Sequence, residues 1–281
     1  MFAVCSLRKI AYYLAIIACF IIGAGVIHTE EKGEEFVVIM YHSILKDTER
    51  TGRYVVRPDS LEADIKYLNS HGYKSVSAEE IINYSKGNGI LPEKSYILTF
   101  DDGSYNNLVY LLPLLEKYDA YAIISIVGSY TEKFSELDEA NAAYSYLRWC
   151  DIDELVKSGR VAIGNHSYDY HDIKNGRIGA KIGKYEDKEK YKKRFYDDMN
   201  KTHTMLFENC AITPVIYTYP YGAYCEEAEQ ILSENGYLMT FTCTEGKNFL
   251  TKNPDSIRLL KRFNRHGNLT TEDFFERCKI Y

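Results

Sequence analysis

Two carboxylates stand side by side in the stretch LTFDDGSYNN, residues 98–107, directly after an apolar run. Packing alone would not select adjacent Asp101 and Asp102, because like charges repel each other. In a straight strand the two side chains would point to opposite faces of the sheet. Gly103 permits a sharp turn at the strand end, which could direct both side chains into one site. A turn or a helix cap, which Asp favours, is the alternative explanation of the pair.

Polar residues also follow three other apolar runs, at the points where strands would end: His42, then His166 with His171, then the turn Pro220-Tyr221-Gly222. Two imidazoles and one carboxylate form a three-ligand set that leaves positions open on Zn²⁺ or a similar divalent cation. Such a cation polarises a carbonyl and lowers the pKa of bound water. One carboxylate of the pair would then bind the cation while its neighbour accepts the proton of the water.

The two later histidines are five residues apart, so they do not share a helix face as residues four apart do. His166 and His171 therefore reach one cation only from a loop. Asp169 between them would either orient an imidazole or occupy a turn. A single histidine at a strand end is more often a structural residue, and this alternative also applies to His42.

The elements that must position these residues alternate between short apolar runs and helical stretches. Expected strands span residues 36–41, 95–100, 121–127, 161–165, 215–219 and 238–243, with a weaker one at 257–260. Expected helices span 61–71, 107–118, 152–158, 186–207, 226–235 and 271–279, the last capped by Thr270 or Thr271. Continuous apolar runs are typical of strands covered on both faces. The pattern predicts one α/β barrel-like domain with its chemistry where the strands end.

The first 29 residues differ in composition from the rest. Arg8 and Lys9 precede 18 uncharged residues, 10–27, which predict a secretory signal or a membrane-spanning anchor. The protein is therefore expected to be extracytoplasmic, either membrane-anchored or secreted after cleavage. Without Arg8 and Lys9, 32 basic residues face 40 acidic ones, a net charge of −8 that is opposite in sign to that of a nucleic-acid binder.

One segment, residues 174–195, is rich in glycine and then densely charged. It predicts a flexible loop that runs into a solvated helix. The alternative is a loop over the active site that contacts polar substrate.

With these residues assembled, the chain resembles the polysaccharide deacetylases of carbohydrate esterase family 4, the NodB-homology group. TFDDG (99–103) matches the family's first motif, HSYDYH (166–171) is similar to the second, and YPYG (219–222) is similar to the third. The motifs occur in the family's order, and the resemblance spans roughly residues 36–260. It implies a distorted (β/α) barrel of the NodB-homology type, a single catalytic domain over 35–281 after a signal peptide or anchor over 1–29.

The resemblance also implies roles for individual residues. Asp101 would be the general base, and the backbone N–H of Tyr221 would stabilise the oxyanion. A divalent cation, Zn²⁺ or alternatively Co²⁺ or Ni²⁺, would be held by three residues: Asp102, His166 and His171. Pro220 and Trp149 would contact the sugar substrate, although Trp149 would equally serve to pack the start of a helix.

The chain departs from the family's common pattern in three places. Its second-motif histidines are five rather than four residues apart, its third motif lacks the usual Arg, and the late Leu-x-His that supplies a general acid is absent. These departures are similar to the branch that deacetylates poly-N-acetylglucosamine, in which a histidine after the first strand can supply the acid. The resemblance therefore favours His42 over His266 as the general acid.

These features predict a metal-dependent hydrolase that removes acetyl groups from N-acetylglucosamine units of an extracellular or cell-wall polysaccharide, with poly-N-acetylglucosamine favoured. The alternatives are peptidoglycan or chitin oligomers as substrates, another amide hydrolase with the same site, and a glycan-binding barrel without catalytic activity. The expected partners are the N-acetylated polysaccharide and, through the N-terminal segment, a membrane. No nucleic acid is expected, and the sequence indicates no protein partner.

Overall fold

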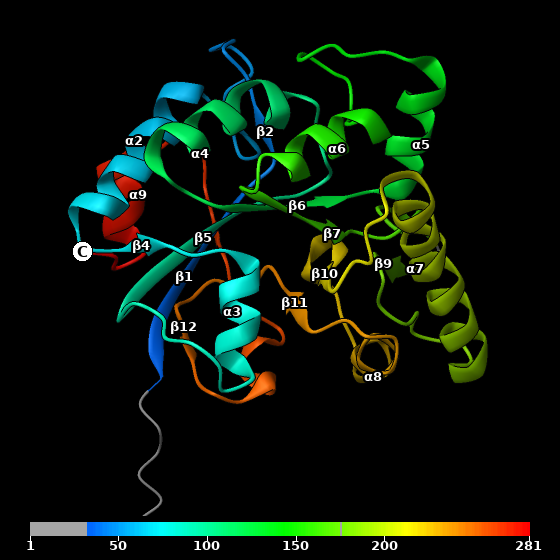
Figure 1. Ribbon diagram of the computed structural model, residues 1–281. Coiled ribbons are helices and arrows are strands. Elements are labelled where there is room, and N and C mark those ends of the chain that lie inside the picture. Colours follow the sequence, from blue (N-terminus) through cyan, green and yellow to red (C-terminus); the bar gives the residue numbers. More distant parts are fainter. Residues whose placement is uncertain (1–32, 175) are drawn as a thin grey trace, which may run out of the picture. The chain divides into compact units, whose positions relative to one another are not determined.

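A curved, mostly parallel sheet lies at the centre of the protein (Figure 1). The computed structural model describes residues 33–174 and 176–281. Within these residues the sheet has nine strands: β1 (Glu34–Tyr41), β4 (Lys74–Ser75), β5 (Lys94–Phe100), β6 (Ala122–Ile126), β7 (Val161–Asn165), β10 (Ile216–Thr218), β11 (Met239–Phe241), β12 (Asn248–Leu250) and β13 (Phe263–Asn264). Two short strand pairs lie apart from it: β2 (Ser43–Ile44) with β3 (Val55–Val56), and β8 (Ile173–Lys174) with β9 (Arg177–Ile178).

The two edges of the curved sheet are joined by one segment, residues 260–264. The strand order is β11-β10-β7-β6-β5-β1-β12, and every neighbouring pair is parallel except β1 with β12. Leu260 forms a parallel bridge to Phe241 of β11, and β13 then pairs in parallel with Ile39 and Met40 of β1. The predicted distorted (β/α) barrel is confirmed by this arrangement.

Helices cover both faces of the sheet (Figure 1). They are α2 (Pro58–Ser70), α3 (Ala78–Ser85), α4 (Leu112–Tyr118), α5 (Gly128–Leu137), α6 (Trp149–Lys157), α7 (Lys188–Cys210), α8 (Glu226–Glu234) and α9 (Thr271–Arg277), with a π-helical turn at Asn107–Leu111 and 3₁₀ turns at Pro220–Gly222 and Pro254–Ile257. Alternate residues of β1 face two different apolar cores, because successive strand side chains point to opposite faces. Val37 and Ile39 pack in the core shared with α2, α4, α6 and α9, whereas Phe36 and Val38 pack in the core shared with α3.

Polar side chains cap the starts of several helices. Ser77 and Glu80 form a reciprocal capping box at α3, and the Asp187 carboxylate accepts the Lys190 N–H at the start of α7. The predicted cap of the last helix is confirmed as Thr270, whose hydroxyl accepts the Asp273 N–H. Such caps satisfy backbone donors that a helix leaves unpaired in its first turn.

One predicted strand does not form, and two helices of the structure were not predicted. The weak strand at 257–260 does not form, since Pro254–Ile257 is a 3₁₀ turn and only Leu260 bridges to β11. Helices α3 and α5 were not predicted; α3 is only 8 residues long, and α5 begins at a glycine, which weakens the local helical pattern.

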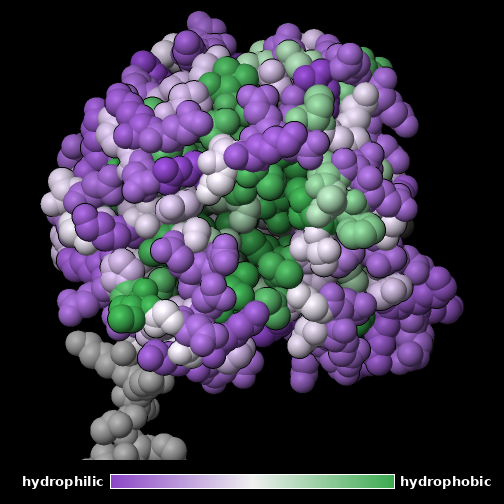
Figure 2. All heavy atoms as spheres, viewed as in Figure 1, coloured by the Kyte–Doolittle hydropathy of each residue, from purple (hydrophilic) through white to green (hydrophobic). Residues whose placement is uncertain are grey.

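A shallow apolar groove of about 350 Å³ opens on the outside of the barrel. Its wall includes Ile82 of α3, Ile163 of β7 and Ile216 of β10. Apolar side chains gather in the centre of the face that Figure 2 shows.

The segment predicted to enter or cross a membrane, within residues 1–29, lies outside the described residues. In the part of the chain that is described, no helix combines the length and apolar character needed to cross a membrane.

A fully buried ion pair ties the start of the barrel to its end. Arg265, just after β13, donates two hydrogen bonds to Asp64 of α2, at 2.7 and 3.1 Å. The hydroxyls of Tyr41 and Thr271 donate to the same carboxylate at 2.9 and 2.7 Å. Four elements distant in sequence therefore meet at one buried charge.

We expect Asp64→Asn to leave the Arg265 guanidinium buried without its counter-charge. Removal of one partner from a buried pair costs roughly 3–5 kcal/mol of unfolding free energy. Urea unfolding followed by circular dichroism measures this change. The matched control is Asp59→Asn on the same helix, whose pair with Arg57 is exposed and should contribute far less. Equal effects of the two changes would contradict the prediction.

Candidate metal and catalytic site

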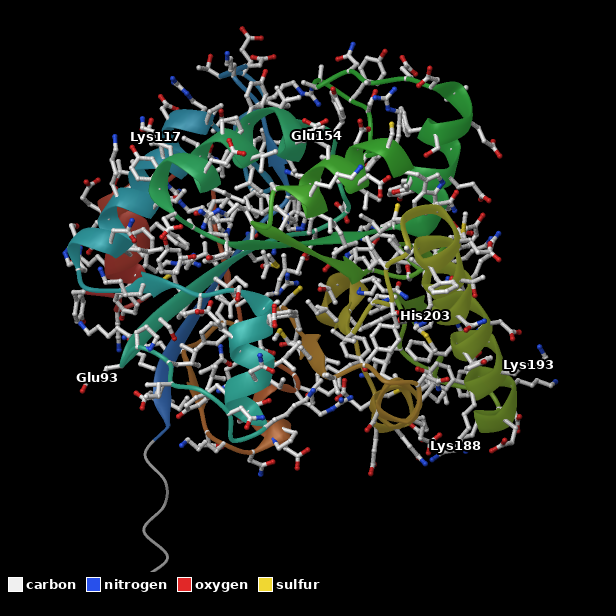
Figure 3. All side chains as sticks on the ribbon, viewed as in Figure 1. Glu93, Lys117, Glu154, Lys188, Lys193 and His203 are labelled. Atoms are coloured by element: carbon white, nitrogen blue, oxygen red, sulfur yellow. The ribbon has the colours of Figure 1, made fainter. Side chains whose placement is uncertain are left out.

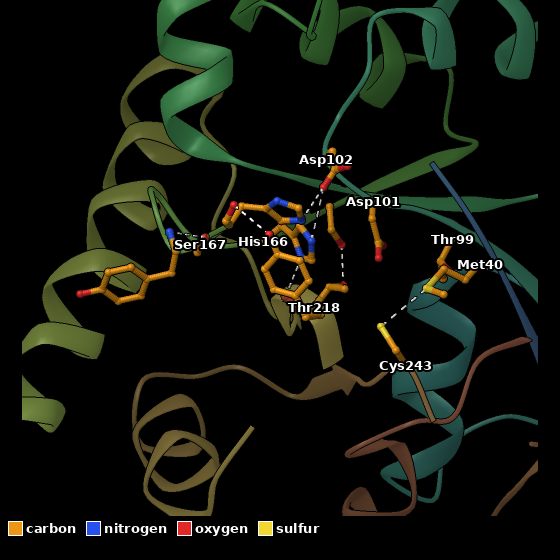
Figure 4. A network of polar contacts seen from close by, with 12 residues as sticks. Met40, Thr99, Asp101, Asp102, His166, Ser167, Thr218 and Cys243 are labelled. Atoms are coloured by element: carbon orange, nitrogen blue, oxygen red, sulfur yellow. Dashed lines mark hydrogen bonds and ion pairs between the residues drawn. The ribbon is translucent and has the colours of Figure 1, made fainter. Parts of the chain in front are cut away.

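The ends of four parallel strands meet in one cleft of about 750 Å³. Figure 4 shows Asp101, Asp102 and His166 close together at these strand ends. β1, β5, β7 and β10 each end at this side of the barrel, as parallel strands of a barrel do. Six of the predicted site residues line the cleft: His42, Asp101, Asp102, His166, His171 and Tyr221. Residues scattered over nearly 180 positions of the sequence are thus brought together by the sheet.

The tight turn after β5 directs both carboxylates into the cleft. Asp102 and Gly103 have φ angles of 70° and 73°, in the left-handed region. A Cβ at Gly103 would lie 2.9 Å from Cγ2 of Ile126, so only glycine fits there without displacing β6. The turn lets Asp101 and Asp102 line the same cleft although they are neighbours in sequence.

Asp102, His166 and His171 form a set of groups that could hold a metal ion. One ligand atom from each lies within 4.8 Å of the others. Asp102 Oδ1 is buried and receives no hydrogen bond from the described residues, although Nε2 of His171 and Nε2 of His166 lie 3.1 and 3.6 Å from it. Three ligand atoms that lie this close together, with an unsatisfied buried oxygen among them, fit a divalent cation of the kind that binds N and O ligands.

The orientation and charge of His166 suit a metal ligand. Its Nδ1–H donates to the Thr218 carbonyl at 2.7 Å, which leaves the Nε2 lone pair facing Asp102. Burial lowers the pKa of His166 to about 4, despite the two nearby carboxylates. The imidazole is therefore neutral at neutral pH, as a metal ligand must be.

Asp101 is held away from this set by a buried arginine. Arg262 donates two parallel hydrogen bonds to the Asp101 carboxylate, at 2.7 and 2.8 Å, and one to the Thr242 carbonyl at 2.8 Å. Burial alone would raise the pKa of Asp101, but the Arg262 charge outweighs it and holds that pKa well below its ordinary value. Asp101 therefore stays ionised, which is the state that a general base requires.

Arg262 was not predicted from the sequence. The third motif lacks the usual arginine, and Arg262 lies 40 residues beyond the end of that motif, at Gly222. The available signal was the basic pair Lys261-Arg262 between the apolar residues of LLKRF (259–263), directly after the weak strand expected at 257–260. The separation of 161 residues from Asp101 hides the pair from any local pattern.

Both candidate general acids, His42 and His266, line the cleft. Nδ1 of His42 is buried without a hydrogen-bond partner among the described residues, and the ring lies 4.7 Å from that of Tyr54. Burial lowers the pKa of His266, helped by the charges of Arg277 and Arg53. The preference for His42 as the acid stays a prediction.

The third-motif turn lies beside the histidine loop. Tyr221 has a φ of 59°, its ring centre lies 4.9 Å from that of His171, and its hydroxyl donates to the His171 carbonyl at 3.2 Å. A Cβ at Gly222 would lie 2.4 Å from the backbone nitrogen of Cys243, so the turn packs closely on the chain after β11. Pro220 is buried in this turn and is not among the residues that line the cleft.

Trp149 lies at the start of α6, away from the cleft. Its ring packs against the core shared with α2 and α4, and its backbone N–H donates to Ser135 Oγ at 3.0 Å. It is not among the residues that line the cleft. This placement agrees with the packing alternative rather than with sugar binding.

The charged insertion, residues 174–195, forms part of the β8–β9 hairpin and the start of α7. Lys188 and Lys193 extend into solvent from α7, with 72% and 78% of their side chains exposed (Figure 3). Gly179 packs against the Pro220 carbonyl, where a Cβ would approach to 2.5 Å. Among the described residues, none from the insertion lines the cleft. The solvated-helix prediction is therefore the one that the contacts favour.

Residues 88–240, more than half of the chain, match the model of the polysaccharide deacetylase family. The chain belongs to the polysaccharide deacetylase family. The poly-beta-1,6-N-acetyl-D-glucosamine N-deacetylase of Escherichia coli K12 is 27% identical over 232 residues, which cover 75% of this chain and 34% of the relative. The protein of the same name from Staphylococcus aureus N315 is 26% identical over 195 residues, 68% of this chain and 62% of the relative.

The solved structure of IcaB from Ammonifex degensii has the same fold, with a TM-score of 0.70. It is 22% identical in sequence, and the match covers 89% of this chain and 97% of that one. The match with this chain spans about a third of the length of the E. coli relative. Family membership and fold are thereby shown, and the family is one of metal-dependent enzymes.

We expect Asp102→Asn to weaken binding of Zn²⁺ by tenfold or more, since a neutral amide replaces the anionic ligand. Isothermal titration of the metal-free protein with Zn²⁺ measures the affinity. Asp169→Asn is the matched control, because Asp169 lies in the same loop but outside the three-ligand set. If Asp102→Asn binds Zn²⁺ as tightly as the control, the proposed ligand set is wrong.

Proposed function

We propose that this polysaccharide deacetylase removes N-acetyl groups from N-acetylglucosamine units of an extracytoplasmic polysaccharide, with poly-N-acetylglucosamine as its substrate. The observation that carries the proposal is the pair of adjacent carboxylates with different surroundings. Asp101 is ionised and bound to Arg262, whereas Asp102 turns an unsatisfied oxygen toward two imidazoles. Hydrolysis of an amide needs both a base and an electrophilic centre, and this arrangement separates the two roles.

A divalent cation held by Asp102, His166 and His171 would polarise the acetamide carbonyl and make water a stronger nucleophile. Asp101 would accept the proton of the attacking water. The backbone N–H of Tyr221, in a turn beside the histidine loop, would stabilise the charge that develops on the carbonyl oxygen. His42 would donate a proton to the leaving amine nitrogen, so that the products are a free amino sugar and acetate.

The cleft suits a polymer of neutral sugars. Three tyrosines on its wall expose about half of their surface, with Tyr54 at 48%, Tyr144 at 55% and Tyr221 at 44%. Exposed aromatic rings offer flat apolar faces, of the kind that ligand pockets use against apolar ligand surfaces. The relatives named above support poly-N-acetylglucosamine, and the uncharged stretch at 10–27 supports export.

We expect the full-length protein to release acetate from poly-N-acetylglucosamine oligomers. Parallel assays with peptidoglycan and with chitin oligomers test the substrate, and a chelator followed by Zn²⁺ tests the metal. Asp101→Asn should abolish release without loss of Zn²⁺ binding, because Asp101 is not a ligand. Asp169→Asn, in the loop between the two histidines but not on the wall of the cleft, should keep it. Faster release from peptidoglycan would overturn the substrate, and no release from any glycan would overturn the activity.

We expect Arg262→Lys to move the acid limb of the pH–rate profile to higher pH. Arg262 holds the pKa of Asp101 below its ordinary value, and a lysine cannot make the two parallel hydrogen bonds. The pKa of Asp101 would rise, so the base would lose its ionised form at a higher pH. The measurement is kcat/KM for acetate release against pH, with Arg160→Lys, from an exposed pair on the outside, as control. An unchanged acid limb would contradict the role given to Arg262.

A further inference from the structure

A buried carboxylate on α7 forms no ion pair with any described residue and has no place in the proposed reaction. Asp198 is 9% exposed, and it takes part in none of the ion pairs of the described residues. Burial raises the pKa of Asp198 to about 6. A residue needed only to pack α7 would be apolar, because a buried carboxylate is costly unless other groups compensate it.

The groups that compensate Asp198 belong to the loop between the two histidines. Asp198 Oδ1 accepts the Tyr168 N–H at 2.9 Å, and Oδ2 accepts the Asp169 N–H at 2.8 Å. Each carboxylate oxygen thus holds one of two successive backbone donors. These residues lie midway between His166 and His171, so the carboxylate binds the centre of the loop.

The side chains of β7 and of the histidine loop itself accept backbone N–H groups only near the two ends of that loop, at Ser167 and Tyr170. Asn165 Oδ1 accepts the Ser167 N–H at 2.9 Å, and Ser167 Oγ accepts the Tyr170 N–H at 3.0 Å. Ser167 has a φ of 76°, in the left-handed region, so the chain turns sharply directly after His166. The middle of the loop depends on Asp198 for its hydrogen-bond acceptors.

The carbonyl side of the same loop is held by α5. The Gly128 N–H donates to the Ser167 carbonyl and the Ser129 N–H donates to the Tyr168 carbonyl, both at 3.0 Å. No side chain caps α5, so these carbonyls satisfy its first donors. A Cβ at Gly128 would lie 2.5 Å from Thr202 Oγ1, which shows how closely α5 and α7 meet around the loop. These contacts do not involve the Asp198 side chain.

We propose that Asp198 is a positioning residue for the metal site: from α7, its carboxylate holds the backbone between His166 and His171 in the one shape that lets both imidazoles reach the same ion. The inference rests on the proposed metal site and not on the identity of the glycan. Histidines five residues apart share no helix face, so their convergence with Asp102 within 4.8 Å depends on the path of the loop. Partners that orient metal ligands in this way are worth about 10–100-fold in metal affinity.

The test is Asp198→Asn in the full-length, metal-free protein, titrated with Co²⁺ and followed by the visible absorption of the bound ion. An asparagine has one acceptor oxygen, and its NH₂ group would face the second backbone N–H. We expect the Kd for Co²⁺ to rise about tenfold or more. Asp197→Asn, the neighbouring exposed residue that pairs with Lys193, should leave the Kd unchanged. Equal Kd values for Asp198→Asn and the wild type would overturn the proposal.

Loss of stability must be separated from loss of positioning. Leu206→Ala removes a buried side chain of α7 that lies two turns beyond Asp198. It should lower the melting temperature but leave the Co²⁺ affinity of the folded protein unchanged. If Leu206→Ala weakens Co²⁺ binding as much as Asp198→Asn does, the effect is one of general packing and the proposal fails.

Hydrogen exchange in the metal-free wild type gives a test that does not depend on a variant that folds. The amides of Tyr168 and Asp169 should exchange slowly, because Asp198 holds both. Exchange of both amides at the rate of an unstructured peptide would overturn the proposal. Since Co²⁺ binding and amide exchange are the readouts, a failure to release acetate from any glycan would leave this inference standing.

Discussion

The buried ion pair of Asp101 with Arg262 connects the chemistry of the cleft to the closure of the barrel. Removal of two charges from water costs several kcal/mol per ion, and only good geometry with additional hydrogen bonds offsets that cost. Here the guanidinium makes two parallel bonds to the carboxylate and a third to the Thr242 carbonyl. Arg262 lies between Leu260, which bridges to β11, and β13, which pairs with β1. The carboxylate therefore has its counter-charge only when the two edges of the sheet are joined.

This pair also explains how two neighbouring carboxylates differ in function. The oxygens of Asp101 are occupied by Arg262, whereas Asp102 Oδ1, beside two imidazoles, is buried and accepts no hydrogen bond within the described part of the chain. The turn at Asp102 and Gly103, with positive φ at both residues, lets the two side chains line one cleft in different surroundings. Adjacent groups in different surroundings can take the roles of base and ligand, which identical surroundings would not allow.

The histidine loop illustrates a second constraint, that backbone groups removed from water must find partners. Its N–H groups are accepted by Asn165, Ser167 and Asp198, and its carbonyls accept from the start of α5. The loop is therefore held by α5 and α7 together, although it has no regular secondary structure of its own. A site built this way keeps its geometry through the packing of the helices around it.

Most of the candidate site could be predicted from the sequence, because its signals are local. Apolar runs mark β1, β5, β7 and β10. A polar residue directly after such a run lies at the end of a strand, whichever strand is its neighbour in the sheet. The approximate bounds of α7 and the cap of α9 also follow from local pattern. The prediction of a strand at 257–260 was wrong because it also relied on a local signal. An apolar run alone does not reveal that Pro254 begins a 3₁₀ turn.

The sequence by itself determined the fold class, the family motifs and six residues that line the cleft. Only the tertiary structure decided that Arg262 pairs with Asp101, that Asp198 holds the histidine loop and that Trp149 packs away from the cleft. The physical reason is that spacing and hydrophobic period report what neighbours along the chain do. A buried charge, by contrast, is satisfied by whatever the closed barrel brings beside it, and for Asp101 that partner is 161 residues away.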